Sequence, residues 1–101
     1  MSSYVPVAKR SDIRRGRSKS FTVKGKRIAV FNDGEDFHAL DNTCAHARGS
    51  LGRGHIKNGL TICPVHGYVY DAKTGACRTD ARLHVNVYEV AVKGDTIEVK
   101  C

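Results

Sequence analysis

The chain has 101 residues, 41% of them hydrophobic, with ten glycines and two prolines. These values suit one domain spanning residues 1–101, and no apolar run approaches the roughly 20 residues that a membrane-spanning helix needs. Seventeen basic against ten acidic residues give a net charge of +7. This charge indicates either a solvated surface or an acidic or nucleic-acid partner.

The predicted elements are short and nearly all extended. Residues 11–13 favour one helical turn, and residues 20–32 alternate apolar and polar positions on both sides of Lys24-Gly25, as a β-hairpin does. Residues 36–40, 60–62 and 69–70 favour further strands. The stretch 85–100 gives two more strands about a turn at residues 93–95. This pattern predicts an all-β sandwich or small barrel.

The N-terminal residues 1–16 have no apolar stretch after their basic residues, so they do not resemble a signal peptide. We therefore expect a cytoplasmic protein, monomeric when isolated, in which the four cysteines stay reduced. Metal binding then explains spaced cysteines better than disulfides do. Cys77 and Cys101 lie outside the spaced pattern; we expect Cys77 to be a small buried residue and Cys101 to be exposed.

Two short runs carry the candidate metal ligands. Cys44-Ala45-His46 is followed, after sixteen residues, by Cys63-Pro64-Val65-His66. Thiolate and imidazole together suit zinc, or iron with bridging sulfide. A mononuclear zinc site allows this order of ligands, but a two-iron centre gives it a purpose: each loop supplies one thiolate to one iron and one imidazole to the other.

These residues resemble the Rieske iron–sulfur motif, in which the second histidine is followed by a glycine, here Gly67. The resemblance extends from the stretch VAKRSDI near the N-terminus to VYEVAVKGDTIEV near the end. It is similar to bacterial Rieske ferredoxins of oxygenase systems and to the small subunit of assimilatory nitrite reductase. It implies an antiparallel β-sandwich with a small subdomain whose loops, near residues 43–54 and 63–71, bind one [2Fe-2S] cluster per chain.

The resemblance also implies roles for single residues. Cys44 and Cys63 would hold the inner iron, and His46 and His66 the outer iron. Pro64, Gly67, Tyr68 and Tyr70 would form the surroundings of the cluster, with Tyr70 donating to a ligating sulfur. Such centres have potentials of about −150 to +300 mV.

High-potential members carry an extra cysteine in each loop and a serine after the glycine. Here Val65 and Tyr68 stand at the second loop's cysteine and at the serine. Because fewer donors near a cluster stabilise the added electron less, we predict the low-potential class. Many relatives also shield the cluster with a proline-containing segment, which residues 77–86 lack.

The function predicted is one-electron transfer, without catalysis by the chain alone, from a flavin- or NAD(P)H-linked reductase to an oxygenase or reductase acceptor with an acidic docking face. The alternatives are an electron-transfer subunit of nitrite reductase and, more remotely, a zinc-stabilised basic module that binds nucleic acid. Much of the charge excess lies early in the chain: Lys9, Arg10, Arg14, Arg15, Arg17, Lys19, Lys24, Lys26 and Arg27.

For the other histidines and for two arginines, the sequence gives weaker evidence of their location or role. His38 is predicted to be an exposed strand residue and His55 a surface residue, while His84 precedes a strand and has no evident partner. Arg48 and Arg53 flank His46, where they either serve solvation or steer an acidic partner.

Overall fold

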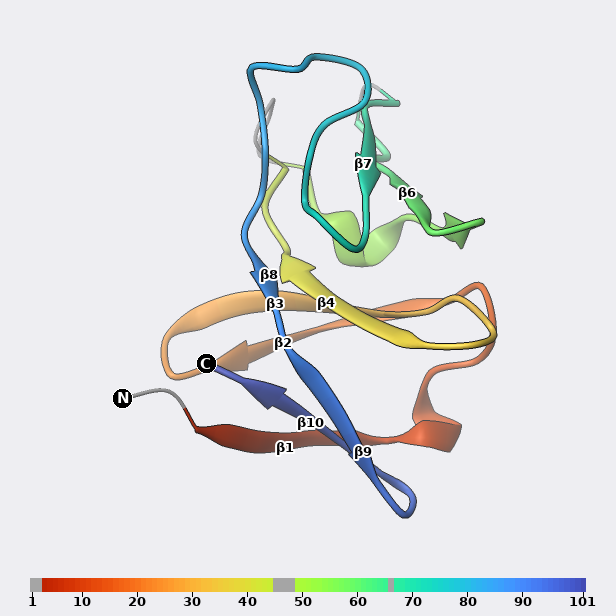
Figure 1. Cartoon of the computed structure of the whole chain (residues 1–101), viewed down its shortest axis with the longest axis vertical. Coiled ribbons are helices and arrows are strands. Elements are labelled where there is room, and N and C mark those ends of the chain that lie inside the picture. Colours follow the sequence, from red (N-terminus) through yellow and green to blue (C-terminus); the bar gives the residue numbers. More distant parts are fainter. Residues whose placement is uncertain (1–2, 45–48, 66) are drawn as a thin grey trace.

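Three antiparallel sheets make up the computed structural model, which describes residues 3–44, 49–65 and 67–101 (Figure 1). The base sheet has the order β1-β10-β9, and the central sheet the order β2-β3-β4-β8. A smaller sheet, β5-β6-β7, lies at the top of the view, with β1 at the bottom. In chain order the strands are β1 Tyr4–Lys9, β2 Ser18–Val23, β3 Lys26–Asn32, β4 Phe37–Asp41, β5 Ile56–Lys57, β6 Leu60–Ile62, β7 Val69–Asp71, β8 Val87–Tyr88, β9 Val90–Lys93 and β10 Thr96–Lys100. Two single 3-10 turns accompany them, η1 Arg10–Asp12 and η2 Leu51–Arg53.

The β2–β3 hairpin forms where the sequence predicts it. Its two connecting residues, Lys24 and Gly25, have φ values of 50° and 79°. Two consecutive positive φ angles give the turn twist that matches the right-handed twist of the flanking strands. The hairpin at residues 93–96 turns at Gly94, whose φ of 62° also lies in the positive region, which glycine adopts without strain.

Strand β3 is buried on both of its faces, which explains its continuous apolar run from Ile28 to Phe31. Ile28 and Val30 pack toward the base sheet, in a core completed by Ile13, Val23, Ala39, Ile97 and Val99. Ala29 and Phe31 point to the other side, into a second core. The central sheet therefore separates two cores, and a strand buried on two sides loses the polar alternation of a half-exposed one.

The second core belongs to the end of the molecule that carries the small sheet. Its other members are Leu40, Cys44, Leu51, Ile56, Cys63, Tyr70, Ala72, Cys77 and Val85. Three of the four cysteines are thus buried together on one side of the central sheet. The expectation that Cys77 is a buried small residue is confirmed, whereas Cys101 is half-buried rather than exposed.

The predicted all-β antiparallel class is confirmed, as are the hairpin, β4, β6, β7 and β10. The single strand predicted before β10 is divided at Glu89 into β8 and β9, which belong to different sheets. Strands β1 and β5 have no counterpart in the predicted elements. In β1, Pro6 removes a ladder donor and the pairing with β10 shifts register between Pro6 and Ala8, so the local pattern of a strand is weak. The described residues contain no helix of the length and apolarity needed to cross a membrane.

Candidate metal centre

The first predicted loop leaves the end of β4 and is closed by backbone hydrogen bonds. The Cys44 amide donates to the carbonyl of Gly49 at 2.9 Å, and Thr43 and Ser50 form a β-bridge beside them. Cys44 is buried, with 3% of its surface exposed. His46, the second predicted ligand of this loop, lies outside the described residues, as does Arg48.

Asn42 anchors the base of this loop. Its side-chain oxygen Oδ1 accepts hydrogen bonds from the Gly52 amide at 2.9 Å and from the Ser50 hydroxyl at 3.1 Å. The backbone amide of Asn42 donates to the backbone carbonyl of Arg27 in β3. Asn42 is buried and its oxygen is satisfied, so the loop is fixed to the central sheet. Sequence reasoning missed this residue, whose partners lie 8 and 10 positions away along the chain.

The second predicted loop leaves β6 and is closed in a similar way. The Cys63 amide donates to the carbonyl of Tyr68 at 2.7 Å, and the Gly67 amide donates to the carbonyl of Cys63 at 2.9 Å. Cys63 is 1% exposed, whereas Pro64 and Gly67 are exposed. Gly67 has a φ of 73°, in the left-handed region that favours glycine. His66 lies outside the described residues.

The two loops meet at Gly49. A Cβ on this residue would lie 2.9 Å from the Sγ of Cys63 and would collide with the side chain of Val65. Contacts this short are not found for real side chains, so the position accepts glycine and little else. The first loop therefore lies directly against the thiol of the second, and the two thiols belong to one buried cluster.

Tyr70 connects the small sheet to the first loop. Its hydroxyl lies 3.0 Å from the Sγ of Cys44, and the residue is fully buried in β7. When Cys44 is a thiolate, the hydroxyl must be the donor, because a thiolate has no proton to give. Tyr68, the other tyrosine singled out in the sequence, is half-buried and packs against the same core.

A third segment, residues 77–84, lies beside the second loop and was not predicted to do so. The Arg78 amide donates to the carbonyl of Val69 at 2.7 Å, and the Val69 amide donates to the Thr79 hydroxyl at 3.0 Å. The Asp80 amide lies 3.4 Å from the Sγ of Cys77. Hydrogen bonds thus hold this segment without a proline. The sequence showed only that this segment lacks a proline and did not indicate its neighbours.

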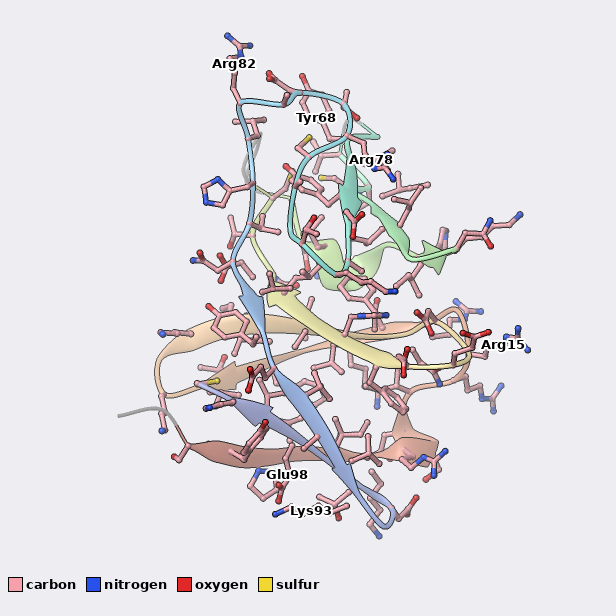
Figure 2. The ribbon with its side chains drawn as sticks, viewed as in Figure 1. Arg15, Tyr68, Arg78, Arg82, Lys93 and Glu98 are labelled. Atoms are coloured by element: carbon pink, nitrogen blue, oxygen red, sulfur yellow. The ribbon has the colours of Figure 1, made fainter. Side chains whose placement is uncertain are left out.

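The arginines at this end of the molecule have acidic neighbours. Arg82 makes two hydrogen bonds to Asp80, at 2.8 and 3.0 Å, and these bonds and the negative charge of Asp80 raise the pKa of Arg82. Arg78 lies 4.0 Å from Asp71. Figure 2 shows Arg82 and Arg78 near Tyr68, at the end that carries β7. Arg53 is exposed on η2.

The other histidines were predicted with mixed success. His55 is exposed, as predicted, and His84 is exposed beside its bridge partner Ala76. The prediction that His38 is exposed is wrong. Its side chain is 10% exposed, and its Nε2 lies 2.6 Å from the Oδ2 of Asp33, because the turn after β3 folds back over β4.

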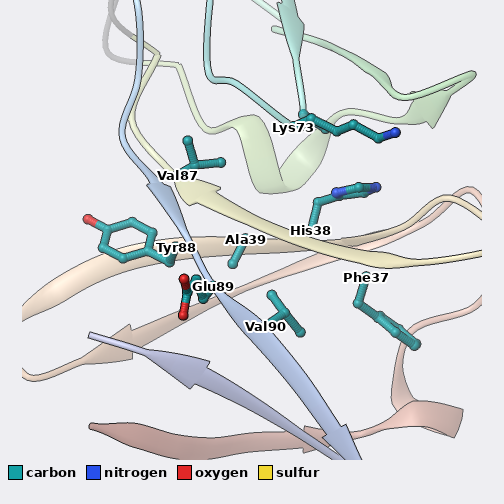
Figure 3. Close-up of a pocket in the computed structure, with 9 residues that line it drawn as sticks. Phe37, His38, Ala39, Lys73, Val87, Tyr88, Glu89 and Val90 are labelled. Atoms are coloured by element: carbon teal, nitrogen blue, oxygen red, sulfur yellow. The ribbon is translucent and has the colours of Figure 1, made fainter. Parts of the chain in front are cut away.

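A surface hollow of about 300 Å³ lies beside His38, between β4 and the β8–β9 segment. Figure 3 shows His38 and Lys73 on one side of β4, and Tyr88, Glu89 and Val90 beside it. No cysteine lines this hollow, and it opens along the half of β4 that β8 leaves unpaired. It is therefore separate from the buried thiols.

Buried thiols in two facing loops fit a soft-metal centre, and comparisons with known proteins agree. The family model described as the Rieske [2Fe-2S] domain matches residues 3–90. The anthranilate 1,2-dioxygenase ferredoxin subunit of Burkholderia cepacia is 32% identical over 75 residues, covering 73% of this chain and 69% of that protein. Ferredoxin CarAc of Metapseudomonas resinovorans is 29% identical over 98 residues, covering 95% and 92%.

Solved structures give the same result. The ferredoxin of carbazole 1,9a-dioxygenase from Nocardioides aromaticivorans IC177 is 32% identical, with a TM-score of 0.89 and 96% of each chain covered. A protein described as an NADH-dependent nitrite reductase small subunit from Mycobacterium tuberculosis has a TM-score of 0.91 at 19% identity, covering 100% of this chain and 96% of that one, and this likeness shows the fold alone. With a family match over most of its length and relatives at this identity, the chain belongs to the Rieske [2Fe-2S] domain family.

Proposed function

We propose that this protein is a one-electron carrier whose cofactor is a single [2Fe-2S] cluster held at the end of the molecule that carries β6 and β7. The observation that carries the proposal is the pair of buried thiols, Cys44 and Cys63, in two loops that meet at Gly49. When bound, the cluster accepts and releases one electron. A relative that is the ferredoxin subunit of a dioxygenase and a second relative, ferredoxin CarAc, support this role.

In this proposal the cluster-binding loops lie near residues 43–54 and 63–71. Cys44 and Cys63 hold the inner iron, and His46 and His66 hold the outer iron. The chemistry of the donor set supports the assignment, since each loop supplies one thiolate and one imidazole and both cysteines are withdrawn from solvent. The family match makes a two-iron centre a better account of these donors than the zinc alternative.

The surrounding residues position the loops and tune the cluster. The Tyr70 hydroxyl donates to the Cys44 sulfur and favours the reduced, more negative state. Gly67 supplies the turn after His66, and exposed Pro64 stiffens the second loop. Because Val65 replaces a cysteine and Tyr68 replaces a serine donor, we propose a low potential; a midpoint well above zero contradicts it.

The partners proposed are a flavin- or NAD(P)H-linked reductase as donor and an oxygenase or reductase protein as acceptor. A solved complex of reduced oxygenase and oxidized ferredoxin in carbazole 1,9a-dioxygenase, whose ferredoxin-like match is 28% identical to this chain, supports an oxygenase acceptor. The net charge of +7 favours partners with acidic docking faces. One electron changes this charge by one, so docking tolerates both redox states. We place the protein in the cytoplasm, monomeric when isolated.

The second candidate is the electron-transfer subunit of a nitrite reductase. The fold is compatible with this role, since a nitrite reductase small subunit shares it with a TM-score of 0.91. Co-purification separates the two: a subunit stays with a large reductase chain through chromatography, whereas a carrier elutes alone and reduces an added oxygenase.

Electron paramagnetic resonance of the dithionite-reduced protein tests the cluster, together with assays of iron and labile sulfide. We expect two irons and two sulfides per chain and the spectrum of mixed cysteine and histidine ligation. His46→Ala and His66→Ala should abolish that spectrum, and the exposed His55→Ala should leave it intact. A spectrum that survives both ligand substitutions contradicts the ligand assignment.

A further inference from the structure

The largest charge excess of this protein lies in one stretch of the chain. Residues 9–27 contain nine of the 17 basic residues and one of the ten acidic residues, which gives +8. The rest of the chain has eight basic and nine acidic residues, which gives −1. The segment comprises the end of β1, η1, the connection to β2, β2 itself, the β2–β3 turn and the first two residues of β3. We call this segment the basic edge.

None of the described cations of the basic edge forms an ion pair, although Arg10 and Arg15 line hollows that also contain Asp33, Glu35, Asp36 and Asp95. Among the described residues, every ion pair joins side chains at or beyond position 33. The polar contacts that cations of the edge do make are to neutral groups: Arg27 donates to the hydroxyls of Ser20 and Thr22, and Lys24 donates to Ser3 and to the carbonyl of Cys101. These contacts hold the side chains and leave the charge uncompensated.

An apolar groove runs along the same edge. Strands β1 and β2 are both edge strands, each paired on one side, and they face each other across a groove of about 340 Å³. Val5 and Val7 of β1 and Phe21 and Val23 of β2 line it, and Lys24 lies at its end. An apolar floor with a cationic rim has the composition of a protein–protein interface.

Protection against aggregation does not account for this arrangement. Edge strands commonly carry a lysine that prevents pairing with another chain, and Lys19 in β2 serves that purpose. Most of the cations, however, lie outside the strand edge, in η1, in the connection Arg14–Arg17 and in the β2–β3 turn. A nucleic acid duplex would use the charge, but it presents mainly phosphates and sugars at its surface, whereas the groove is lined mostly by aliphatic side chains, so an acidic and partly apolar protein surface is the better fit.

The β1 side of the basic edge lies away from the proposed electron-transfer end. In Figure 1, β1 lies at the bottom of the view and β6 and β7 lie at the top. Strand β2 belongs to the central sheet, and its Ser18 hydroxyl donates to the carbonyls of Gly52 and Gly54, so the start of β2 is closer to the first loop. The arginines beside the second loop, Arg78 and Arg82, have acidic partners. The end that exposes Val65 and Ile62 is partly apolar and also positive, since residues 43–84 have six basic and two acidic residues. Its charge of +4 is smaller than the +8 of residues 9–27.

We propose that the basic edge, with its groove between β1 and β2, is a docking surface for an acidic and partly apolar protein surface, which holds the carrier while its cluster end stays free. The inference rests on the proposed function only in that a carrier must hold one partner and deliver an electron. A partner bound at the base sheet does not cover the loops of Cys44 and Cys63.

The test uses the full-length protein with its cluster and two short peptides of equal charge, one alternating glutamate with leucine and one alternating glutamate with serine. Binding is measured by calorimetry at about 20 and about 200 mM salt, because screening weakens surface electrostatics over this range. We expect the leucine peptide to bind more tightly than the serine peptide, and both to weaken as salt rises. Equal affinity for the two peptides overturns the role of the groove.

Two matched charge reversals locate the surface. Arg17→Glu with Lys19→Glu changes the edge, and Lys73→Glu with Lys93→Glu changes exposed positions elsewhere; each pair takes the net charge from +7 to +3. We expect roughly tenfold weaker peptide binding for the first pair and less than about twofold for the second. Equal losses for the two pairs, or tighter binding of a short DNA duplex than of either peptide, overturn the proposal.

The redox test is independent of these results. The resonance spectrum of the reduced cluster should be the same in both double variants, which also verifies that they fold. If the wild-type protein has no Rieske spectrum, the proposed function is refuted, but the peptide-binding measurement still tests the docking surface. A normal spectrum with no difference between the two double variants refutes the basic edge alone.

Discussion

The two faces of the central sheet are built by different means. On the base side, regular strands and aliphatic side chains such as Ile28, Val30 and Ile97 form the core. On the other side, short strands, loops and three cysteines fill the space, and close approaches at Gly49 replace regular packing. One sheet thus separates a core of regular strands from a core that contains the cysteines, so matched substitutions on its two faces can be compared.

The largest expected effect is a loss of unfolding free energy, which can be compared between one substitution in each core. Phe31→Ala and Ile28→Ala remove fully buried side chains from opposite faces of β3, at a cost of about 3–5 and 2–5 kcal/mol of unfolding free energy respectively. Chemical denaturation measures both. We expect Phe31→Ala also to speed the loss of iron, because it loosens the core around Cys44 and Cys63. An equal rate of iron loss in the two variants contradicts the separation.

A smaller effect is expected where the two loops meet. Gly49→Ala places a methyl group against the Cys63 sulfur and Val65, and such overpacking costs about 1–3 kcal/mol. The bound iron should fall together with the melting temperature. Gly94→Ala is the control on the base side: it strains a φ of 62° but meets no neighbour within 4 Å, so it should lower stability and leave the iron content unchanged.

Tyr70 and Tyr88 allow the two sides of the central sheet to be compared through the loss of a single hydrogen bond on each side. Tyr70→Phe removes a donor to the Cys44 sulfur, and because the reduced cluster is more negative, the midpoint potential should fall by on the order of 50 mV, about tenfold in the equilibrium constant. Tyr88→Phe removes the 2.6 Å bond to Asp41 on the base side. It should cost about 1 kcal/mol of stability and leave the potential unchanged. Redox titration distinguishes them.

The smallest expected effect lies at the end of the sheet, in the turn between β3 and β4. Burial of Asp33 raises its pKa, but the Asp36 amide, the His38 side chain and the Glu35 amide stabilise the carboxylate more and lower the pKa below 3.8 overall. A depressed folded pKa contributes stability that is present above the unfolded value and is lost as pH falls through the folded one. Denaturant midpoints should therefore decline below about pH 4. Asp33→Asn should flatten this decline, and exposed Glu35→Gln should not.

Local signals predicted the parts of the fold that depend on neighbouring residues. The alternation on both sides of Lys24-Gly25 and the turn at Gly94 predicted hairpins that form at those positions. The burial of β3 on both faces did not follow from its apolar run, which a buried helix segment shares. His38 was wrongly expected at the surface because its partner Asp33 comes from a turn whose backward fold is not encoded in the strand pattern.

The order of two thiols and two imidazoles in the sequence predicted a metal centre and its family, because ligand chemistry depends on residue type and short spacing. The resemblance also implied that Tyr70 contacts a ligating sulfur, and the structure shows that this sulfur is that of Cys44. Tertiary structure decided the rest: the approach of the two loops at Gly49, the segment 77–84 beside the second loop, and the β1–β2 groove beside Lys24. These features join residues far apart in the chain. Only packing around the central sheet brings them together.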